Sequence, residues 1–173
     1  DGFDGENGGS IERIDPAFEA LVPQGAKIEK LAGGFIFTEG PVWDQRGNRL
    51  YFSDLRSNAI HTWSDEEGLD IFLQPVFEGE AAHESVGSNG LTNDQQGRLL
   101  FMEHGNRLVS RLETNGSRTI LAHSYGFSRL NSPNDSVWHS SGWLYFTDPS
   151  YGLPELESDP LRELDFNGIY KLY

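Results

Sequence analysis

Three polar residues, Glu39, Asn89 and Asn134, occupy one position of a sequence pattern that occurs three times in the chain. Each stands eight residues before a glycine, and these glycines are Gly47, Gly97 and Gly142. One carboxylate and two carboxamides offer oxygen atoms without soft nitrogen or sulfur donors, which suits a hard cation such as calcium with its about six to eight oxygen ligands. The alternative is that each residue only caps a turn where a strand begins. The shared chemistry favours a ligand site.

Each copy of the pattern reads as two short strands around a glycine turn and ends near an acidic residue. The copies are EGPVWDQRGNRLYFSD at 39–54, NGLTNDQQGRLLFMEH at 89–104 and NDSVWHSSGWLYFTDP at 134–149. A repeat of about 40–50 residues built of short strands is typical of a β-propeller blade. Because equivalent positions of successive blades surround one axis, we expect Glu39, Asn89 and Asn134 to converge at the same end of neighbouring four-stranded sheets.

The predicted fold class is therefore all-β, a propeller of which about three blades are visible. Residues 11–173 form this partial propeller domain, with blades near 33–75, 86–123 and 130–173. In the first blade, alternation and turn residues predict strands at 41–43, 50–52, 59–63 and 69–73.

Segments around the blades carry further expectations. Residues 168–172 look like a delayed third strand of the last blade, so 150–167 is an insertion that helps to shape a pocket. Residues 1–10, rich in glycine and acid, are expected to be a flexible lead. A short helix or turn is expected within 11–22 and a strand at 27–32.

Composition excludes several classes of partner. The chain has 27 acidic and 13 basic residues and a formal charge of -14, so phosphate backbones are repelled and no nucleic acid is expected. No apolar run approaches the length that crosses a bilayer, so no membrane partner is expected. With no cysteine, disulfides and thiolate metal sites are excluded. Cytoplasmic and exported locations both stay open.

Several motifs together resemble the SMP-30/gluconolactonase/LRE-like family, specifically its bacterial-type gluconolactonases. They are TEGPVW at 38–43, LYFSD at 50–54, EHG at 103–105, RLNSPND at 129–135 and YFTDPSYG at 145–152. The similarity runs from about Ile11 to the last residue. It implies a six-bladed propeller with one divalent cation, usually calcium, in its central tunnel, and hydrolysis of a sugar lactone as the activity. Zinc, magnesium and manganese are the alternative cations.

The resemblance also implies roles for single residues. Glu39 matches the family's metal carboxylate of the first blade, and Asn134 matches an asparagine that sits at the metal or at the bound sugar. Asp135, the acid beside it, is the candidate general base for a metal-activated water. Asn89, Arg129 and His104 are the other candidates for substrate contacts, although Arg129 could equally order a loop and His104 could equally satisfy a buried hydrogen bond.

Other polar residues favour structural roles. Asp54, Glu103 and Asp148 end equivalent strands, and hydrogen bonds to turns are the preferred interpretation. His83 is expected in a solvated loop rather than at a ligand. A serine nucleophile is not indicated, because no GxSxG elbow is present.

The chain departs from the family pattern in length. A six-bladed member needs about twice this length, so we expect either a fragment or two halves that self-associate around one axis, the fragment being favoured because Tyr173 falls within a blade. Two other function classes stay open. One is a calcium-dependent phosphotriesterase of the same fold, and the other is a non-enzymatic ligand-binding propeller.

Overall fold

A computed structural model describes residues 9–80 and 83–173 of the chain. The chain divides into two compact units, one that ends at Gly34 and one from Phe35 to Tyr173. The lead expected at 1–10 lies, up to residue 8, outside the described residues.

The first unit contains one short 3-10 helix, η1 (Pro16–Ala20), within the segment where a helix or turn is predicted. Asp15 caps it by accepting a hydrogen bond from the Ala17 backbone nitrogen at 2.8 Å, and Pro16 suits the first helical position because it lacks an N–H. The strand predicted at 27–32 is wrong: no described strand pairs with this segment, and an extended chain needs a ladder partner to be stable. In the described part of the chain, no helix has the length and apolarity needed to cross a membrane.

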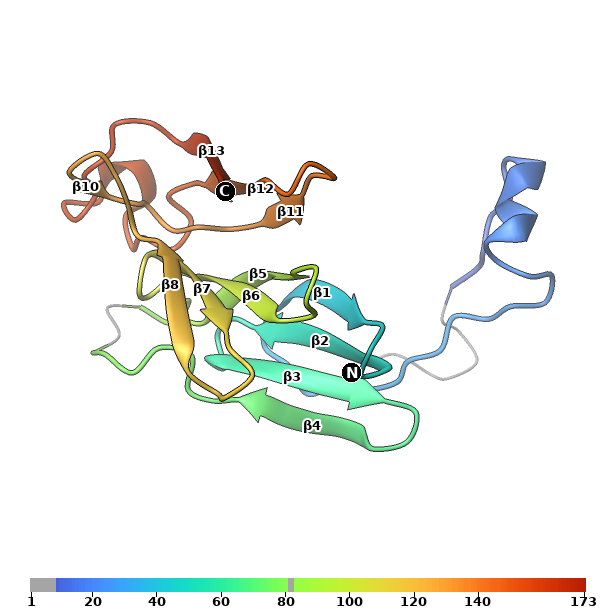
Figure 1. The fold of residues 1–173 in the computed structure, drawn as a ribbon. Helices are drawn as coiled ribbons and strands as arrows, with labels where there is room; N and C mark the ends of the chain where they lie inside the picture. Colours follow the sequence, from blue (N-terminus) through green and yellow to red (C-terminus); the bar gives the residue numbers. More distant parts are fainter. Residues whose placement is uncertain (1–8, 81–82) are drawn as a thin grey trace. The chain divides into compact units, whose positions relative to one another are not determined.

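The second unit is built of antiparallel sheets whose strands follow one another in chain order (Figure 1). The first sheet holds β1 (Thr38–Asp44), β2 (Arg49–Asp54), β3 (Ala59–Ser64) and β4 (Gly68–Leu73). The second holds β5 (Ser88–Asn93), β6 (Leu99–Glu103), β7 (Leu108–Leu112) and β8 (Arg118–Ala122). The third holds β11 (Ser136–Trp138), β12 (Leu144–Asp148) and β13 (Gly168–Leu172). A small ribbon of β9 (Ser124–Tyr125) and β10 (Ser128–Arg129) precedes it, and η2 (Leu156–Ser158) lies in the insertion before β13.

The strands form where local sequence predicts them. All four strands of the first sheet include the predicted ranges, and β13 pairs with β12 as the expected delayed strand. The third sheet has three strands among the described residues rather than the expected four.

The core consists of two apolar clusters on either side of the second sheet. Strand β6 is buried along its whole length. Its first four residues, LLFM, accordingly form a continuous apolar run instead of an alternating pattern, as in strands that are covered on both faces. Leu99 and Phe101 pack toward the first sheet. Their cluster also contains Tyr51, Ile60, Val76 and Leu91. Leu100 and Met102 pack toward the third sheet. Their cluster also contains Val109, Leu130, Leu144, Phe146 and Leu164.

The first strands of the three sheets approach one another closely at their starts. A Cβ atom on Gly40 would lie 2.4 Å from the carbonyl oxygen of Asn89, and one on Gly90 would lie 2.6 Å from that of Asn134. The Gly90 backbone nitrogen donates to this Asn134 oxygen at 2.6 Å. Glycine therefore follows the first two repeat residues, Glu39 and Asn89, because only hydrogen fits between neighbouring strands there.

Gly40 provides a test of this close approach. Replacing Gly40 by alanine is expected to lower the free energy of unfolding by about 2–4 kcal/mol, because the new Cβ overlaps a carbonyl and alanine is strained at the φ of 54° found there. Urea unfolding followed by tryptophan fluorescence measures the loss. Gly116→Ala is the matched control, since φ is 82° there but a Cβ would meet nothing within 4 Å. Equal losses in the two variants would contradict the packing explanation.

Candidate functional site

The three repeat residues line one pocket of about 390 Å³. Glu39 and Asn134 are half-buried and Asn89 is buried. The rest of the lining consists of Phe37, Leu55, Arg56, Ser85, His104 and Tyr151. Residues that are about 50 positions apart in the chain are thus brought together, as the repeat pattern predicts.

A buried serine pair fixes the strands that carry two of these residues. Glu39 pairs with Ser53 in the ladder between β1 and β2. The Ser53 hydroxyl lies 2.7 Å from the Ser88 hydroxyl and donates to the Asn89 carbonyl oxygen at 2.8 Å. This link between β2 and β5 holds Glu39 and Asn89 on the same wall of the pocket.

The aspartates at the ends of equivalent strands accept hydrogen bonds from backbone nitrogens. Asp54 accepts hydrogen bonds from the Ile36 and Phe37 backbone nitrogens, at 3.0 and 2.9 Å, and Asp148 does the same for Asn131 and Ser132, both at 2.8 Å. The structural role predicted for both aspartates is confirmed. Each therefore anchors the segment that leads into the first strand of its own sheet.

The two aspartates differ in their pKa. Burial raises the pKa of Asp148 to about 6, although the backbone hydrogen bonds from Asn131 and Ser132 oppose the rise. At Asp54, burial also raises the pKa, but the hydrogen bonds from Ser57, Phe37 and Ile36 together outweigh it and leave the pKa below its usual value.

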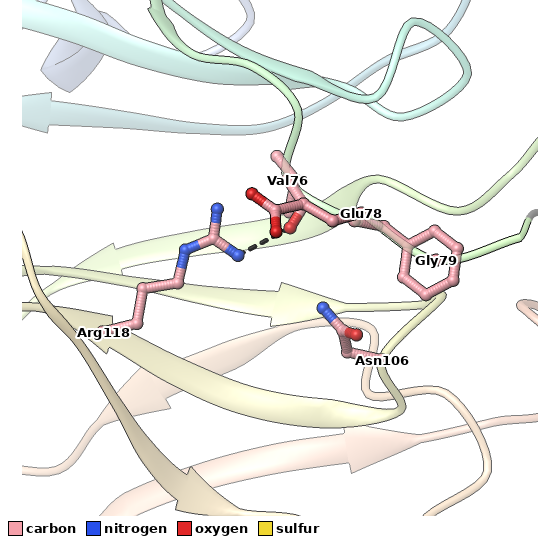
Figure 2. Close-up of a pocket in the computed structure, with 6 residues that line it drawn as sticks. Val76, Glu78, Gly79, Asn106 and Arg118 are labelled. Atoms are coloured by element: carbon pink, nitrogen blue, oxygen red, sulfur yellow. Dashed lines mark hydrogen bonds between the residues drawn. The ribbon is translucent and has the colours of Figure 1, made fainter.

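Glu103, the equivalent acid of the second repeat, lies away from the candidate site. It is 1% exposed and accepts a short hydrogen bond from Asn106, and its carboxylate is 3.8 Å from Arg118. Burial raises the pKa of Glu103. Arg118 in turn donates to the Val76 carbonyl oxygen at 2.6 Å across a second pocket of about 370 Å³ (Figure 2). These groups join the linker after β4 to β8, so Glu103 has a structural role.

His104 is the other buried polar group of the pocket. Its Nε2 lies 3.3 Å from the Asn89 Nδ2, and the ring is 2% exposed. A Cβ on Gly152 would lie 2.7 Å from the His104 Cγ, so the start of the insertion packs directly on the ring. Tyr151, the residue before Gly152, lines the pocket.

His83 fastens this insertion in place. Its Nε2 forms a hydrogen bond with the Gly152 carbonyl oxygen at 2.8 Å, and its Nδ1 accepts one from the Ser85 backbone nitrogen at 3.1 Å. Because it is half-buried and bound to backbone, the expectation of a solvated His83 is wrong. The hydrophilic residues around His83 in the sequence gave no signal of its hydrogen bond with Gly152, which is 69 residues away.

The burial of His104 makes stability depend on pH. Burial is the main cause that lowers the pKa of His104 from 6.5 to about 4, and nearby His83 contributes. The unfolded chain therefore takes up a proton near pH 6.5, whereas the folded chain does so only near pH 4. The stabilisation is complete above pH 6.5 and is lost as the pH falls to 4, by about 3 kcal/mol.

Urea unfolding at pH 7 and pH 4 tests this dependence. Relative to His104→Gln, which cannot titrate, the unchanged chain should lose about 3 kcal/mol more between the two pH values. His139→Gln, at an exposed site, is the control and should keep the full dependence. A parallel pH dependence of the wild type and His104→Gln would refute the assignment to His104.

Two other predicted site residues do not line the pocket. Arg129 is exposed on β10, where it donates to the Asn106 carbonyl oxygen at 3.1 Å and its backbone nitrogen donates to Glu163 at 2.7 Å. Asp135 is also exposed, and its Oδ1 accepts from the Ser136 backbone nitrogen at 2.8 Å. Their functional roles stay predictions.

Sequence reasoning missed several of the lining residues. Tyr151 lies in the insertion that was expected to shape a pocket, so that expectation was the available signal. Leu55 and Arg56 directly follow the LYFSD motif, but their position after a turn acid carries no chemical signal of its own.

The donor atoms of the pocket fit a hard cation in kind. Glu39 offers a carboxylate and Asn89 and Asn134 offer carboxamide oxygens on the same lining, which is the chemistry that calcium prefers. Residues 9–80 and 83–173 contain no cluster of three His, Cys, Asp or Glu side chains that would hold a metal. Three such side chains would supply only part of the about six to eight oxygens that calcium takes.

Comparison with known proteins gives consistent relatives. Residues 37–172 match the family model described as the SMP-30/Gluconolactonase/LRE-like region. A gluconolactonase from Zymomonas mobilis subsp. mobilis is 33% identical over 175 residues, which are 98% of this chain and 49% of the relative. The solved structure of a gluconolactonase from Xanthomonas campestris is 30% identical with a TM-score of 0.71, over 84% of this chain and 46% of that one. Another solved structure, provisionally described as a gluconolactonase, is 35% identical with a TM-score of 0.77, over 91% and 52% of the two chains.

The fold agrees with this relationship. The three sheets are blades of a β-propeller, and the chain spans about half the length of the relatives that it matches. Regucalcin from Agrobacterium tumefaciens, described as a calcium-binding protein, shares the fold with a TM-score of 0.58 at 16% identity. Because the family model covers most of the residues, the chain belongs to the SMP-30/gluconolactonase/LRE-like family.

Proposed function

We propose that the protein hydrolyses a sugar lactone with the help of a divalent cation, calcium before zinc, magnesium or manganese. The observation that carries this proposal is the shared pocket of Glu39, Asn89 and Asn134 in a chain whose relatives include gluconolactonases. A volume of about 390 Å³ lies within the range of about 300–1,000 Å³ that small-molecule sites have. The proposal of calcium rests on the oxygen donors and on the description of regucalcin as a calcium-binding protein.

Lactone opening requires attack of water on a carbonyl, stabilisation of the oxyanion and departure of the ring oxygen with a proton. A bound cation supplies the Lewis acidity that polarises the carbonyl. Glu39 would hold that cation with its carboxylate, and Asn134 would stand beside it. Asn89, in β5 between the other two residues, would bind the cation or a sugar hydroxyl and so orient the ring.

Asp135 remains the proposed general base. Its Oδ1 is used by the Ser136 backbone, and no described residue donates to its Oδ2. A carboxylate oxygen free to accept a proton from water is what general base catalysis requires. Asp135 is exposed and directly follows Asn134. Its carboxylate would therefore contact the attacking water at the rim of the pocket.

An activity panel separates lactone hydrolysis from the other two function classes. The chain, alone and joined to the remaining half of a gluconolactonase relative, is assayed with aldonolactones and with a model phosphotriester, each with and without a chelator. We expect lactone hydrolysis that the chelator abolishes and calcium restores. Turnover of the phosphotriester alone would favour the phosphotriesterase, and binding of lactones without turnover would favour a ligand-binding propeller.

A further inference from the structure

The orientation of one side-chain amide decides what the pocket offers to a ligand. Asn89 is 5% exposed and lines the pocket, and a carboxamide presents either an acceptor oxygen or a donor NH2 group. The side-chain partner of Asn89 among the described residues is His104, whose Nε2 lies 3.3 Å from the Asn89 Nδ2. An amide nitrogen only donates, so this contact requires a lone pair on the His104 Nε2.

The surroundings of His104 support that state of the ring. In a neutral imidazole whose Nε2 accepts, the proton is on Nδ1. The Nδ1 is buried without a hydrogen-bond partner, so among the described residues the hydrogen bond of this ring is the contact between its Nε2 and Asn89. The ring is confined by Gly152, where a Cβ would lie 2.7 Å from the His104 Cγ. Such burial disfavours the doubly protonated ring, which could not accept from Asn89 at all.

We infer that His104 is a positioning residue that holds the Nδ2 of Asn89 and thereby directs the Asn89 Oδ1 into the pocket. His104 then acts through Asn89 and not by contact with the substrate, which is the buried hydrogen bond that the sequence left open beside a substrate contact. The orientation of the Asn89 amide is inferred from its contact with His104. The use of the oxygen by a cation or a sugar hydroxyl rests on the proposed function.

The opposite orientation would have a clear chemical cost. If Nε2 carried the proton, it would donate to the Asn89 Oδ1, and the NH2 group would face the pocket beside Glu39. A donor group cannot ligate a cation and would itself compete for the Glu39 carboxylate. The position of the proton on His104 thus decides whether Asn89 presents its oxygen or its NH2 group to the pocket.

The first experiment reads the ring directly in the 173-residue chain without any ligand. Long-range 1H–15N correlation spectra at pH 7 distinguish protonated from unprotonated ring nitrogens of the five histidines, and His104→Gln identifies the signals of His104. We expect a protonated Nδ1 and an unprotonated Nε2. A proton on Nε2 would overturn the inference.

The second experiment compares two substitutions at the same site. His104→Gln keeps an acceptor near the position of Nε2, whereas His104→Leu keeps apolar volume without one. In His104→Gln the NMR signals of the Asn89 side-chain NH2 should stay close to their wild-type positions and the calcium dissociation constant should stay within about twofold. In His104→Leu these signals should shift and calcium binding should weaken by about tenfold or more.

The outcomes separate this inference from the proposed function. Unchanged Asn89 signals in a folded His104→Leu chain would overturn the positioning role, whatever its calcium affinity. Absence of calcium binding in every variant, together with the expected ring and amide signals, would leave the positioning role standing and contradict the cation proposal. If His104→Leu does not fold, the tautomer of wild-type His104 decides the question.

Discussion

A verified monomer of the 173-residue chain should open aldonolactones at least about a hundredfold more slowly than the same chain joined to the half of the Zymomonas mobilis gluconolactonase that it does not match. The physical reason is the coordination shell. On the proposed function, Glu39, Asn89 and Asn134 would provide only part of the about six to eight oxygens that calcium takes, and water would complete the shell. A weakly held cation orients the lactone poorly, and a misplacement of about 1 Å costs on the order of a hundredfold in rate.

The measurement compares initial rates of the two proteins at equal concentration, with light scattering to establish the oligomeric state. The half of the Zymomonas mobilis protein that this chain matches, assayed alone, is the matched control and should be equally slow. Because two copies of the chain could complete a site between them, activity that rises with the square of protein concentration would point to assembly. Full turnover by the chain as a monomer would sink the prediction.

Replacement of Glu39 by glutamine should lower calcium affinity and lactone hydrolysis together, each by on the order of a hundredfold. The substitution keeps the shape of the side chain and removes its charge, and Glu39 is the one carboxylate among the pocket-lining residues. A hard cation loses its strongest ligand when that charge is removed. Both quantities are measured on the chain joined to the unmatched half of the Zymomonas mobilis gluconolactonase. Calorimetric titration gives the calcium affinity, and steady-state kinetics give the rate of lactone hydrolysis.

Glu66→Gln, at an exposed turn position, removes the same charge away from the pocket and should leave both quantities unchanged. The joint loss in Glu39→Gln distinguishes a metal ligand from a residue that only binds substrate, since the latter would raise KM without altering calcium affinity. Undiminished hydrolysis by chelator-treated wild type would show that the cation has no part in the reaction.

Local sequence was sufficient for most of the strands and for the roles of some acids. Strands β3 and β13 follow from alternation between turn residues, because side chains on a strand point to opposite faces with a period of two. The hydrogen bonds of Asp54 and Asp148 follow from their place at strand ends. The ribbon of β9 and β10 was not predictable, because each strand has two residues and no period can be read from it.

The repeat by itself determined that Glu39, Asn89 and Asn134 are equivalent and belong together, because a repeated blade places equal positions around a common axis. Only the tertiary structure decided which other side chains join them. Asp135 adjoins Asn134 in sequence but remains outside the lining, whereas Tyr151 and His104 come in from separate loops. The deciding contacts are backbone approaches at Gly40 and Gly90 and the seating of Gly152 on His104. Such contacts join segments far apart in the chain, and hydrophobic periodicity reports which face of a strand is buried but not which distant segment covers it.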